Sequence, residues 1–237
     1  MWRPDAQQRD LRQLLIHRHK LVVIRVRVKN GLHHLMLNRG MQLKRKLWSQ
    51  AGQRVLRELA LQGWAAQRRR DLLQLLANLD EQIKTLDEAV EQAAKENPQA
   101  ALLMTQPGVG PITALAFVLT LGDVRRFRRG KQVASYLGLI PSERSSSQRR
   151  RLGSISKQGN PFVRMLLVES VQAVNRLDEG FRKQYQHRCH RKAKAVAKVA
   201  AARRLAVRLY WMLRSNTPYP EIAHIESSSR NGVVGTS

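Results

Sequence analysis

The fold class is indicated most clearly by residues 72–90, LLQLLANLDEQIKTLDEAV. Apolar residues recur here at alternating intervals of four and three, which is the a/d pattern of a coiled coil. Asn97 and Pro98 then interrupt the pattern, because proline disfavours helical backbone in the residue before it. The stretch therefore predicts a long helix with one narrow apolar seam and a boundary near residue 97. The seam consists of Leu72, Leu76, Leu79, Ile83, Leu86 and Val90.

A second long helix is predicted upstream, over residues 5–39. Leucine and valine recur there on a heptad grid, and Gly40 is expected to end the helix. Residues 24–28 alternate apolar and basic side chains, which also fits a strand, but we favour a helix because the grid continues on both sides. The 72–90 seam needs a partner face, which is either this upstream helix or another subunit.

The charge of the chain points to a polyanionic partner. Its 43 Lys and Arg exceed its 17 Asp and Glu, for a formal net charge of +26. Eleven basic residues lie between Asp123 and Arg164, and eleven more lie between Phe181 and Arg214. Without a long apolar run or a signal peptide, and with one cysteine, we expect a cytoplasmic protein with no membrane role.

These patterns predict a mainly α protein with three parts. Residues 1–97 form a helical linker with a coiled coil, residues 98–215 form a compact helical domain, and residues 216–237 form a disordered tail. The tail is rich in Pro, Ser, Gly and Asn and has no periodicity.

A helix-hairpin-helix is predicted around Pro107-Gly108-Val109-Gly110, with Pro111 starting the second helix. Glycine lets the backbone approach a ligand closely, and a helix N-terminus offers free N–H groups to a phosphate. Gly108 and Gly110 are therefore candidate DNA contacts. The alternative is a plain turn between two packed helices.

A basic serine loop follows within YLGLIPSERSSSQRRRLGSISKQGNPF, residues 136–162. A serine hydroxyl among guanidinium groups has the parts that phosphoryl transfer needs, a nucleophile and cations that stabilise the phosphate oxygens. Only Glu143 lies nearby to take the proton, so the residues by themselves favour a solvated loop that binds phosphate over an active site. Asn160 and Pro161 are expected to cap and begin the next helix. The basic and polar candidates for DNA contact are Arg144, Arg149, Arg150, Arg151, Lys157 and Asn160.

Metal binding has little support in the sequence. His187, Cys189 and His190 lack a second ligand pair for zinc, and we interpret them as side chains of an exposed basic helix. The carboxylates are scattered or lie on the coiled coil, and none falls on a hydrophobic strand. No metal site and no cofactor are expected in this chain.

Four motifs together resemble a known family. PGVG (107–110), GDVRRF (122–127), GLIPSERSS (138–146) and SKQGN (156–160) are similar in order and spacing to the C-terminal domain of DEDD-type insertion-sequence transposases, the bridge-RNA-guided serine recombinases. The upstream helices also resemble the helical linker of that family. The resemblance extends over residues 4–215.

The resemblance implies DNA transposition or site-specific recombination. The family's nucleophilic serine falls five residues after the proline of its GL-x-P motif, which here makes Ser146 the candidate, with Ser145 and Ser147 as register alternatives. In the family this serine works with a RuvC-like domain that holds divalent metal, expected to be Mg²⁺, on Asp-Glu-Asp-Asp. We expect that domain to be missing, because its place precedes Trp2.

The implied partners are DNA, a guide (bridge) RNA, and either a second copy or a full-length transposase that associates through the coiled coil. Without the metal-binding half, this chain is not expected to cleave DNA alone. The alternative is a non-catalytic regulator that binds DNA or RNA, or an inactive transposase remnant.

Overall fold

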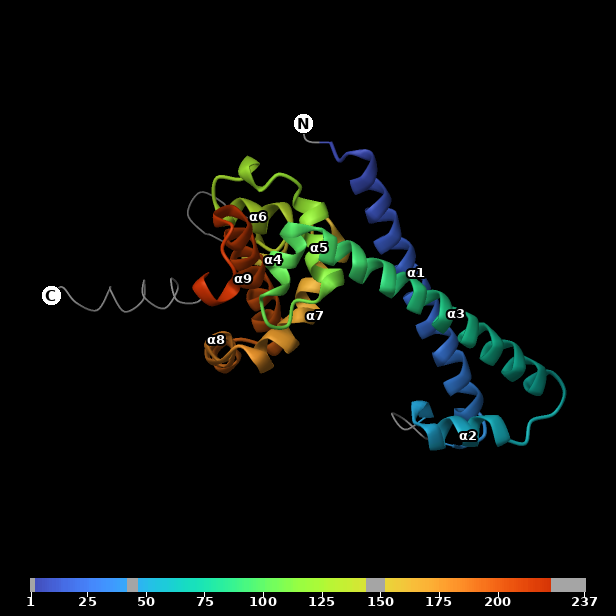
Figure 1. Ribbon diagram of the computed structural model, residues 1–237. Helices are drawn as coiled ribbons and strands as arrows, with labels where there is room; N and C mark the ends of the chain where they lie inside the picture. The colour runs from blue at the N-terminus through green and yellow to red at the C-terminus, as the bar shows by residue number, and fades with distance from the viewer. Residues whose placement is uncertain (1–2, 42–46, 144–151, 223–237) are drawn as a thin grey trace. The chain divides into compact units, whose positions relative to one another are not determined.

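The computed structural model describes residues 3–41, 47–143 and 152–222, and confirms the mainly α class (Figure 1). The chain divides into two compact units. Unit 1 comprises Met1–Arg12 with Val90–Ser237, and unit 2 comprises Gln13–Ala89. The sequence-based domain limits at residues 97 and 215 remain predictions.

Two long helices dominate the N-terminal part of the chain. Helix α1 runs over Ala6–Leu37, so residues 24–28 are helical rather than extended. Gly40, at φ 73°, follows its end and donates its N–H to the Leu37 carbonyl at 2.9 Å, as expected of a helix-ending glycine. Helix α3 runs over Gly63–Glu96 and ends directly before Asn97, at the predicted break.

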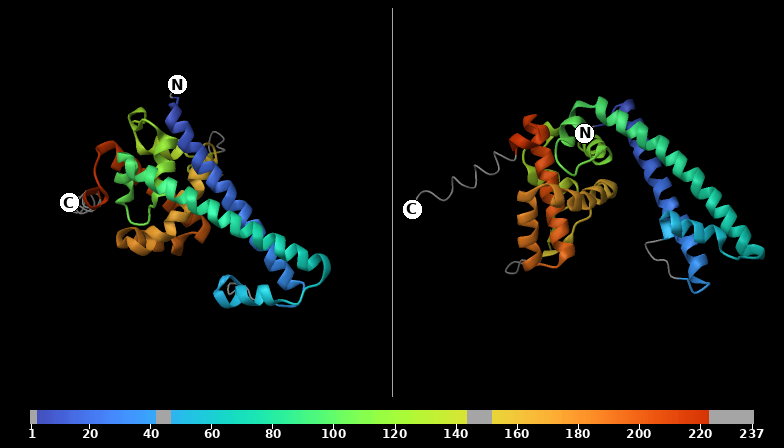
Figure 2. Two further views of the ribbon diagram at one scale, coloured as in Figure 1. Left: turned by 45° about the vertical axis from the view of Figure 1, so that its right-hand side comes forward. Right: turned by 60° about the horizontal axis from the view of Figure 1, so that its bottom comes forward.

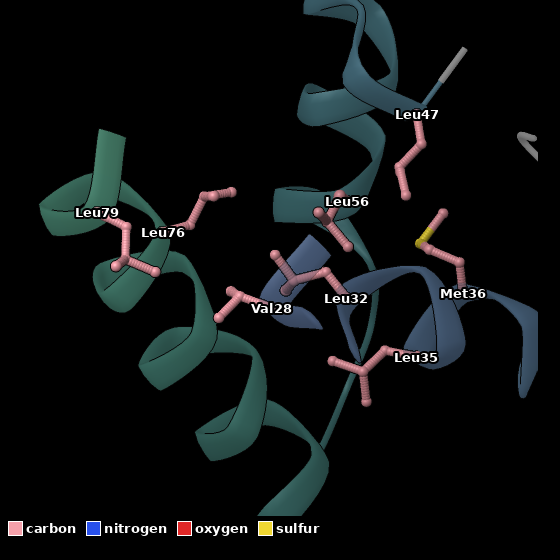
Figure 3. Close-up of a cluster of buried hydrophobic side chains, with 8 residues drawn as sticks. All are labelled: Val28, Leu32, Leu35, Met36, Leu47, Leu56, Leu76 and Leu79. Carbon is pink, nitrogen blue, oxygen red and sulfur yellow. The ribbon is translucent and has the colours of Figure 1, made fainter. Parts of the chain in front are cut away.

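The core of unit 2 lies where α1, α3 and the short helix α2 (Gln50–Glu58) meet. Figure 3 shows Leu76 and Leu79 of the seam pointing toward Val28 and Leu32 of α1. Two ion pairs reinforce this face, Arg18–Asp87 at 2.7 Å and Arg25–Asp80 at 3.3 Å. The seam therefore finds a partner face within the chain, and association with a second subunit remains a prediction.

Unit 1 contains short helices and one hairpin around a helical core. Helix α5 is its most apolar element, with every residue from Thr113 to Leu121 buried. Helix α9 packs against α6, α7 and α8 (Figure 2). The elements are α4 (Pro98–Met104), α5 (Pro111–Leu121), the 3-10 helix η2 (Val124–Arg126), α6 (Gly130–Tyr136), β1 (Pro141–Glu143), β2 (Leu152–Ile155), α7 (Pro161–Leu177), α8 (Glu179–Arg191) and α9 (Lys194–Ser215).

A buried ion pair ties α8 to α9. Arg208 Nη1 lies 2.6 Å from Asp178 Oδ2, and both side chains are 4% exposed. Asp178 Oδ1 accepts the Phe181 N–H at 2.9 Å, which caps α8, and the Gln106 side chain accepts from Arg208 at 3.2 Å. Burial raises the pKa of Asp178, but the hydrogen bonds from Phe181, Arg208 and the Tyr219 side chain and the charge of Arg208 outweigh it and hold the pKa below its ordinary value. Arg208, which the sequence placed in a basic surface block, thus belongs to the core.

None of the helices in the described part of the chain is both long and apolar enough to span a bilayer.

Candidate nucleic-acid interface

A two-stranded hairpin frames the predicted serine loop. Strands β1 and β2 pair antiparallel, with Pro141 opposite Ile155 and Glu143 opposite Leu152. The Ser142 hydroxyl donates to the Ser154 carbonyl at 2.9 Å. The sequence predicted only a loop here, because strands of three and four residues are too short to show an alternating pattern.

The predicted nucleophile and most of its arginines lie outside the described residues. They are Ser146, its register alternatives Ser145 and Ser147, and the cations Arg144, Arg149, Arg150 and Arg151. The structure does place the residues on either side of this segment: Glu143 and Leu152 are register partners. The two described residues that flank the segment therefore lie opposite each other in the hairpin.

The turn over residues 156–159 crosses the end of α6 at very close range. A Cβ on Gly138 would lie 1.9 Å from the Gln158 carbonyl oxygen, and a Cβ on Gly159 would lie 2.0 Å from the main-chain carbonyl oxygen of Tyr136. Lys157 adopts a left-handed φ of 56°, and its N–H donates to the Gly138 carbonyl at 3.2 Å. Both glycines are thus required by the packing, and the exposed Lys157 side chain is carried by a rigidly placed backbone.

Asn160 caps α7, as predicted. Its side-chain oxygen accepts the N–H groups of Phe162 and Val163 at 2.9 and 3.4 Å, and its amide nitrogen donates to the Thr120 hydroxyl at 3.2 Å. These bonds fasten the turn to α5 and give Asn160 a structural role. Its contact with DNA, like that of Lys157, remains a prediction.

Arg164 holds the same turn from the α7 side. Its guanidinium donates to the Leu137 and Gln158 carbonyls at 3.1 and 2.8 Å. Burial lowers the pKa of Arg164 from its ordinary value. Its charge is directed at main-chain carbonyls, so Arg164 helps to build the surface that carries Lys157.

The two glycines of the PGVG turn differ in their surroundings. Gly108, at φ 86°, packs so closely on α7 that a Cβ would lie 2.4 Å from the Val174 nitrogen. Gly110 is exposed at the start of α5, with nothing within 4 Å of its Cβ position and no side-chain cap. Gly108 is thus explained by packing, while Gly110 leaves the N-terminus of α5 open to a ligand. Phosphate contact at this turn remains a prediction.

Several exposed cations lie around η2 and the start of α6, and one of them also makes structural contacts. Arg126 lies over the rings of Phe127 and Tyr136, 4.4 and 4.6 Å from their centroids, and donates to the Leu121 carbonyl. The neighbouring cations were not predicted as DNA contacts from the sequence, because only the structure shows which side chains are exposed. The exposed cations around η2 and the start of α6 are Arg125, Arg126, Arg128, Arg129 and Lys131, and of these Arg126 also has the ring and carbonyl contacts just described.

A hollow of about 580 Å³ joins the hairpin to the second basic block. Pro141 and Ile155 of the hairpin and Val196 and Val199 of α9 line its apolar part. The cations that line it are Arg188, Arg203 and Arg204. Cations of the second basic region therefore lie beside the hairpin that frames the serine segment.

His187, Cys189 and His190 lie at the end of α8. Within the described ranges, no three His, Cys, Asp or Glu side chains gather closely enough to hold a metal ion.

Comparisons with known proteins connect this part of the chain with transposases. Residues 100–186 match the "Transposase IS116/IS110/IS902 family". The "Transposase for insertion sequence element IS1111A" of Coxiella burnetii is 32% identical over 180 residues, which are 72% of this chain and 48% of that protein. The "Probable family 20 transposase" of Pseudomonas aeruginosa is 36% identical over 107 residues, which are 45% of this chain and 32% of that protein.

The "Pilin gene-inverting protein" of Moraxella bovis is 28% identical over 152 residues, which are 63% of this chain and 46% of that protein. This chain thus spans less than half the length of each of these three relatives. The matched family segment, residues 100–186, begins in α4 and ends in α8, so it includes the PGVG turn, the hairpin and the SKQGN turn. Residues 100–186 of this chain therefore carry the domain of the IS116/IS110/IS902 transposase family.

Proposed function

We propose that this chain binds DNA and takes part in DNA transposition or site-specific recombination, supplying the serine-bearing half of a composite active site. The observation that carries the proposal is the hairpin β1–β2, which holds Glu143 opposite Leu152 on either side of the serine segment. A nucleophile must be presented in a fixed geometry to attack a phosphodiester, and paired strands provide a firm base for it.

The surroundings of the hairpin suit a DNA backbone. Lys157 projects from the turn beside the hairpin, and Arg188 and Arg203 line the hollow behind it. Arg125, Arg128, Arg129 and Lys131 add exposed positive charge on the η2–α6 connection. Arginine and lysine that neutralise phosphates supply most of the sequence-independent affinity for DNA.

In the proposed reaction, the Ser146 hydroxyl oxygen attacks a backbone phosphorus and forms a phosphoserine ester. The bond between that phosphorus and the leaving sugar oxygen breaks, and the sugar oxygen departs as a hydroxyl carrying a proton. The arginines that flank Ser146 in the sequence would stabilise the charge on the other phosphate oxygens.

The described residues do not fit a metal site, so no step is assigned to a metal in this chain. In the proposed composite site, a RuvC-like domain outside these residues would hold the divalent metal.

Covalent trapping tests the catalytic part. The chain is incubated with a labelled DNA junction, with and without a full-length family member whose own serine is replaced by alanine. That helper supplies the metal-binding domain but no nucleophile, so an adduct on this shorter chain must come from its own serine. We expect an adduct only with the helper, abolished by Ser146→Ala and retained in Ser154→Ala, a matched change within the same hairpin.

Two results would contradict this assignment. An adduct that survives Ser146→Ala but is lost in Ser145→Ala or Ser147→Ala moves the nucleophile by one residue. No adduct with any helper, while DNA binding persists, favours the second candidate, a non-catalytic regulator of transposition. That candidate requires only exposed cations near the hairpin, such as Lys157 and Arg188.

DNA binding has its own test, which both candidates must pass. With six to ten phosphate contacts, affinity should fall roughly 10³- to 10⁵-fold between 50 and 200 mM salt. Binding should be the same in Ser146→Ala. An affinity that does not change with salt would remove the electrostatic basis of the proposal.

Association with a guide RNA and with a second copy through unit 2 is part of the same proposal.

A further inference from the structure

A tryptophan at the end of unit 2 has no role in packing. Trp64, at the start of α3, is 89% exposed, the largest exposed fraction among the large apolar side chains of the described residues. Trp48 and Trp211 both have ring partners: Lys29 lies 4.8 Å from the Trp48 centroid, and Tyr210 lies 5.1 Å from Trp211. Trp64 has no such contact with any described residue.

The α2–α3 tip, defined as residues 54–71, is also the basic end of unit 2. Its exposed cations are Arg54 and Arg57 on α2 and Arg68 and Arg70 on α3, and none of them forms an ion pair with another described residue. Unit 2 places its other acids elsewhere, at Asp80, Glu81, Asp87 and Glu88. The tip itself has five arginines and two acids, Glu58 and Asp71.

The tip is internally fixed. Arg69 donates from its guanidinium to the Leu59 carbonyl at 2.5 Å and to the Leu56 carbonyl at 3.3 Å, which joins the start of α3 to the end of α2. Leu56 is fully buried in the core of unit 2. Trp64 and Arg68 are four residues apart on α3, so they lie on the same helix face.

We propose that the α2–α3 tip binds unpaired nucleotides, with a base stacked on the Trp64 indole and the adjoining phosphates held by Arg68 and the α2 arginines. A phosphate alone would require no indole. A base within a duplex has both faces already stacked, so a flat exposed ring selects nucleotides whose faces are free. The unpaired nucleotides could belong to RNA or to melted DNA, since both present the same bases and phosphates.

This inference refines the proposed function by assigning unit 2 a ligand different from the duplex bound by unit 1. The full chain is titrated with a 20-nucleotide RNA, the DNA strand of the same sequence, the corresponding duplex, and heparin. Heparin is a polyanion without bases and therefore reports electrostatic binding alone. Comparison of the RNA and DNA strands identifies the source.

Three substitutions separate stacking from other effects. Trp64→Ala removes the side chain, Trp64→Leu keeps an apolar group without a ring, and Trp64→Phe keeps a ring. We expect Ala and Leu to weaken binding of single strands about tenfold, and Phe to stay within about twofold. All three should bind duplex and heparin as the wild type does. Single strands should also quench part of the tryptophan emission, and that part should disappear in Trp64→Phe.

Several outcomes would overturn the inference. Single-strand binding by Trp64→Leu equal to that of the wild type would exclude stacking. Equal weakening for duplex and single strands would mean that the tip does not discriminate between them. A change in oligomeric state in Trp64→Ala, with nucleotide binding intact, would identify the tip as a protein interface. A wild type that binds single strands but no duplex would contradict the proposed function and leave this inference standing.

Discussion

Replacing Arg208 by methionine is expected to destabilise unit 1 by about 3–5 kcal/mol. Methionine keeps much of the side-chain length but leaves the Asp178 carboxylate buried without its counter-ion, with the neutral Phe181 N–H and the Tyr219 side chain as remaining hydrogen-bond partners. It also removes the donor to Gln106, a side chain with no exposed surface. The cost is that of an uncompensated buried charge, which greatly exceeds the 0–1 kcal/mol of a typical surface pair.

Thermal unfolding followed by circular dichroism measures this loss. For a unit of this size, 3–5 kcal/mol corresponds to a fall in Tm of roughly 6–20 °C. Hydrogen exchange of peptides from α8 and α9 assigns the loss to unit 1, since unit 2 contains neither residue. The leucines of unit 2 should keep their protection.

A double-mutant cycle then tests the mechanism. Asp178→Asn keeps an oxygen that can cap α8 but removes the charge, so combining it with Arg208→Met leaves no unpaired ion. The double variant should be more stable than the sum of the two single effects predicts, by at least about 1 kcal/mol. Additive effects, or a loss below about 1 kcal/mol in Arg208→Met, would refute the view that the pair acts as one buried unit.

Three further predictions concern pH and two glycines. The pKa of Asp178 is lowered in the folded state, so its contribution to stability is complete above the ordinary carboxyl pKa and is lost as the pH falls through the lowered value. The Asp178→Asn variant lacks this ionisation, and its Tm should therefore fall less between pH 5 and pH 2 than that of the wild type. Gly110→Asp should leave Tm unchanged or slightly raised, because Asp is a good N-cap. It should weaken duplex binding about fivefold at 50 mM salt relative to the neutral Gly110→Asn, because it adds a negative charge. Equal affinities of the two variants would show that the turn does not contact the duplex. Gly159→Ala should cost at least about 2 kcal/mol in urea unfolding, since its Cβ would lie 2.0 Å from a carbonyl oxygen at a left-handed φ, whereas Gly110→Ala has open space and should cost less than 1 kcal/mol.

The long helices could be predicted because their signal is local. The seam from Leu72 to Val90 repeats every three or four residues, and a proline marks its end, so neighbouring residues contain the information. The helix caps at Gly40 and Asn160 could be predicted for the same reason. The partner of the seam could not be predicted from neighbouring residues, and only the structure shows that α1 packs against it.

The features that the sequence missed depend on residues far apart in the chain. Arg208 and Asp178 are 30 residues apart, and each resembles an ordinary surface charge until the fold buries both. The hairpin β1–β2 depends on main-chain pairing across the serine segment, which side-chain patterns of three and four residues do not reveal. Of the predicted site, Gly108 and Asn160 proved to have packing roles, and Ser146 lies outside the described residues.

The crossing at Gly138 and Gly159 has a consequence for engineering. The base of the hairpin is joined to α6 and α7 through main-chain atoms and the Arg164 guanidinium. We therefore expect that the interval between Glu143 and Leu152 can be exchanged between relatives while both glycines are retained. Chimaeras of this kind would test whether the proposed role of that interval can be transferred independently of the scaffold around it.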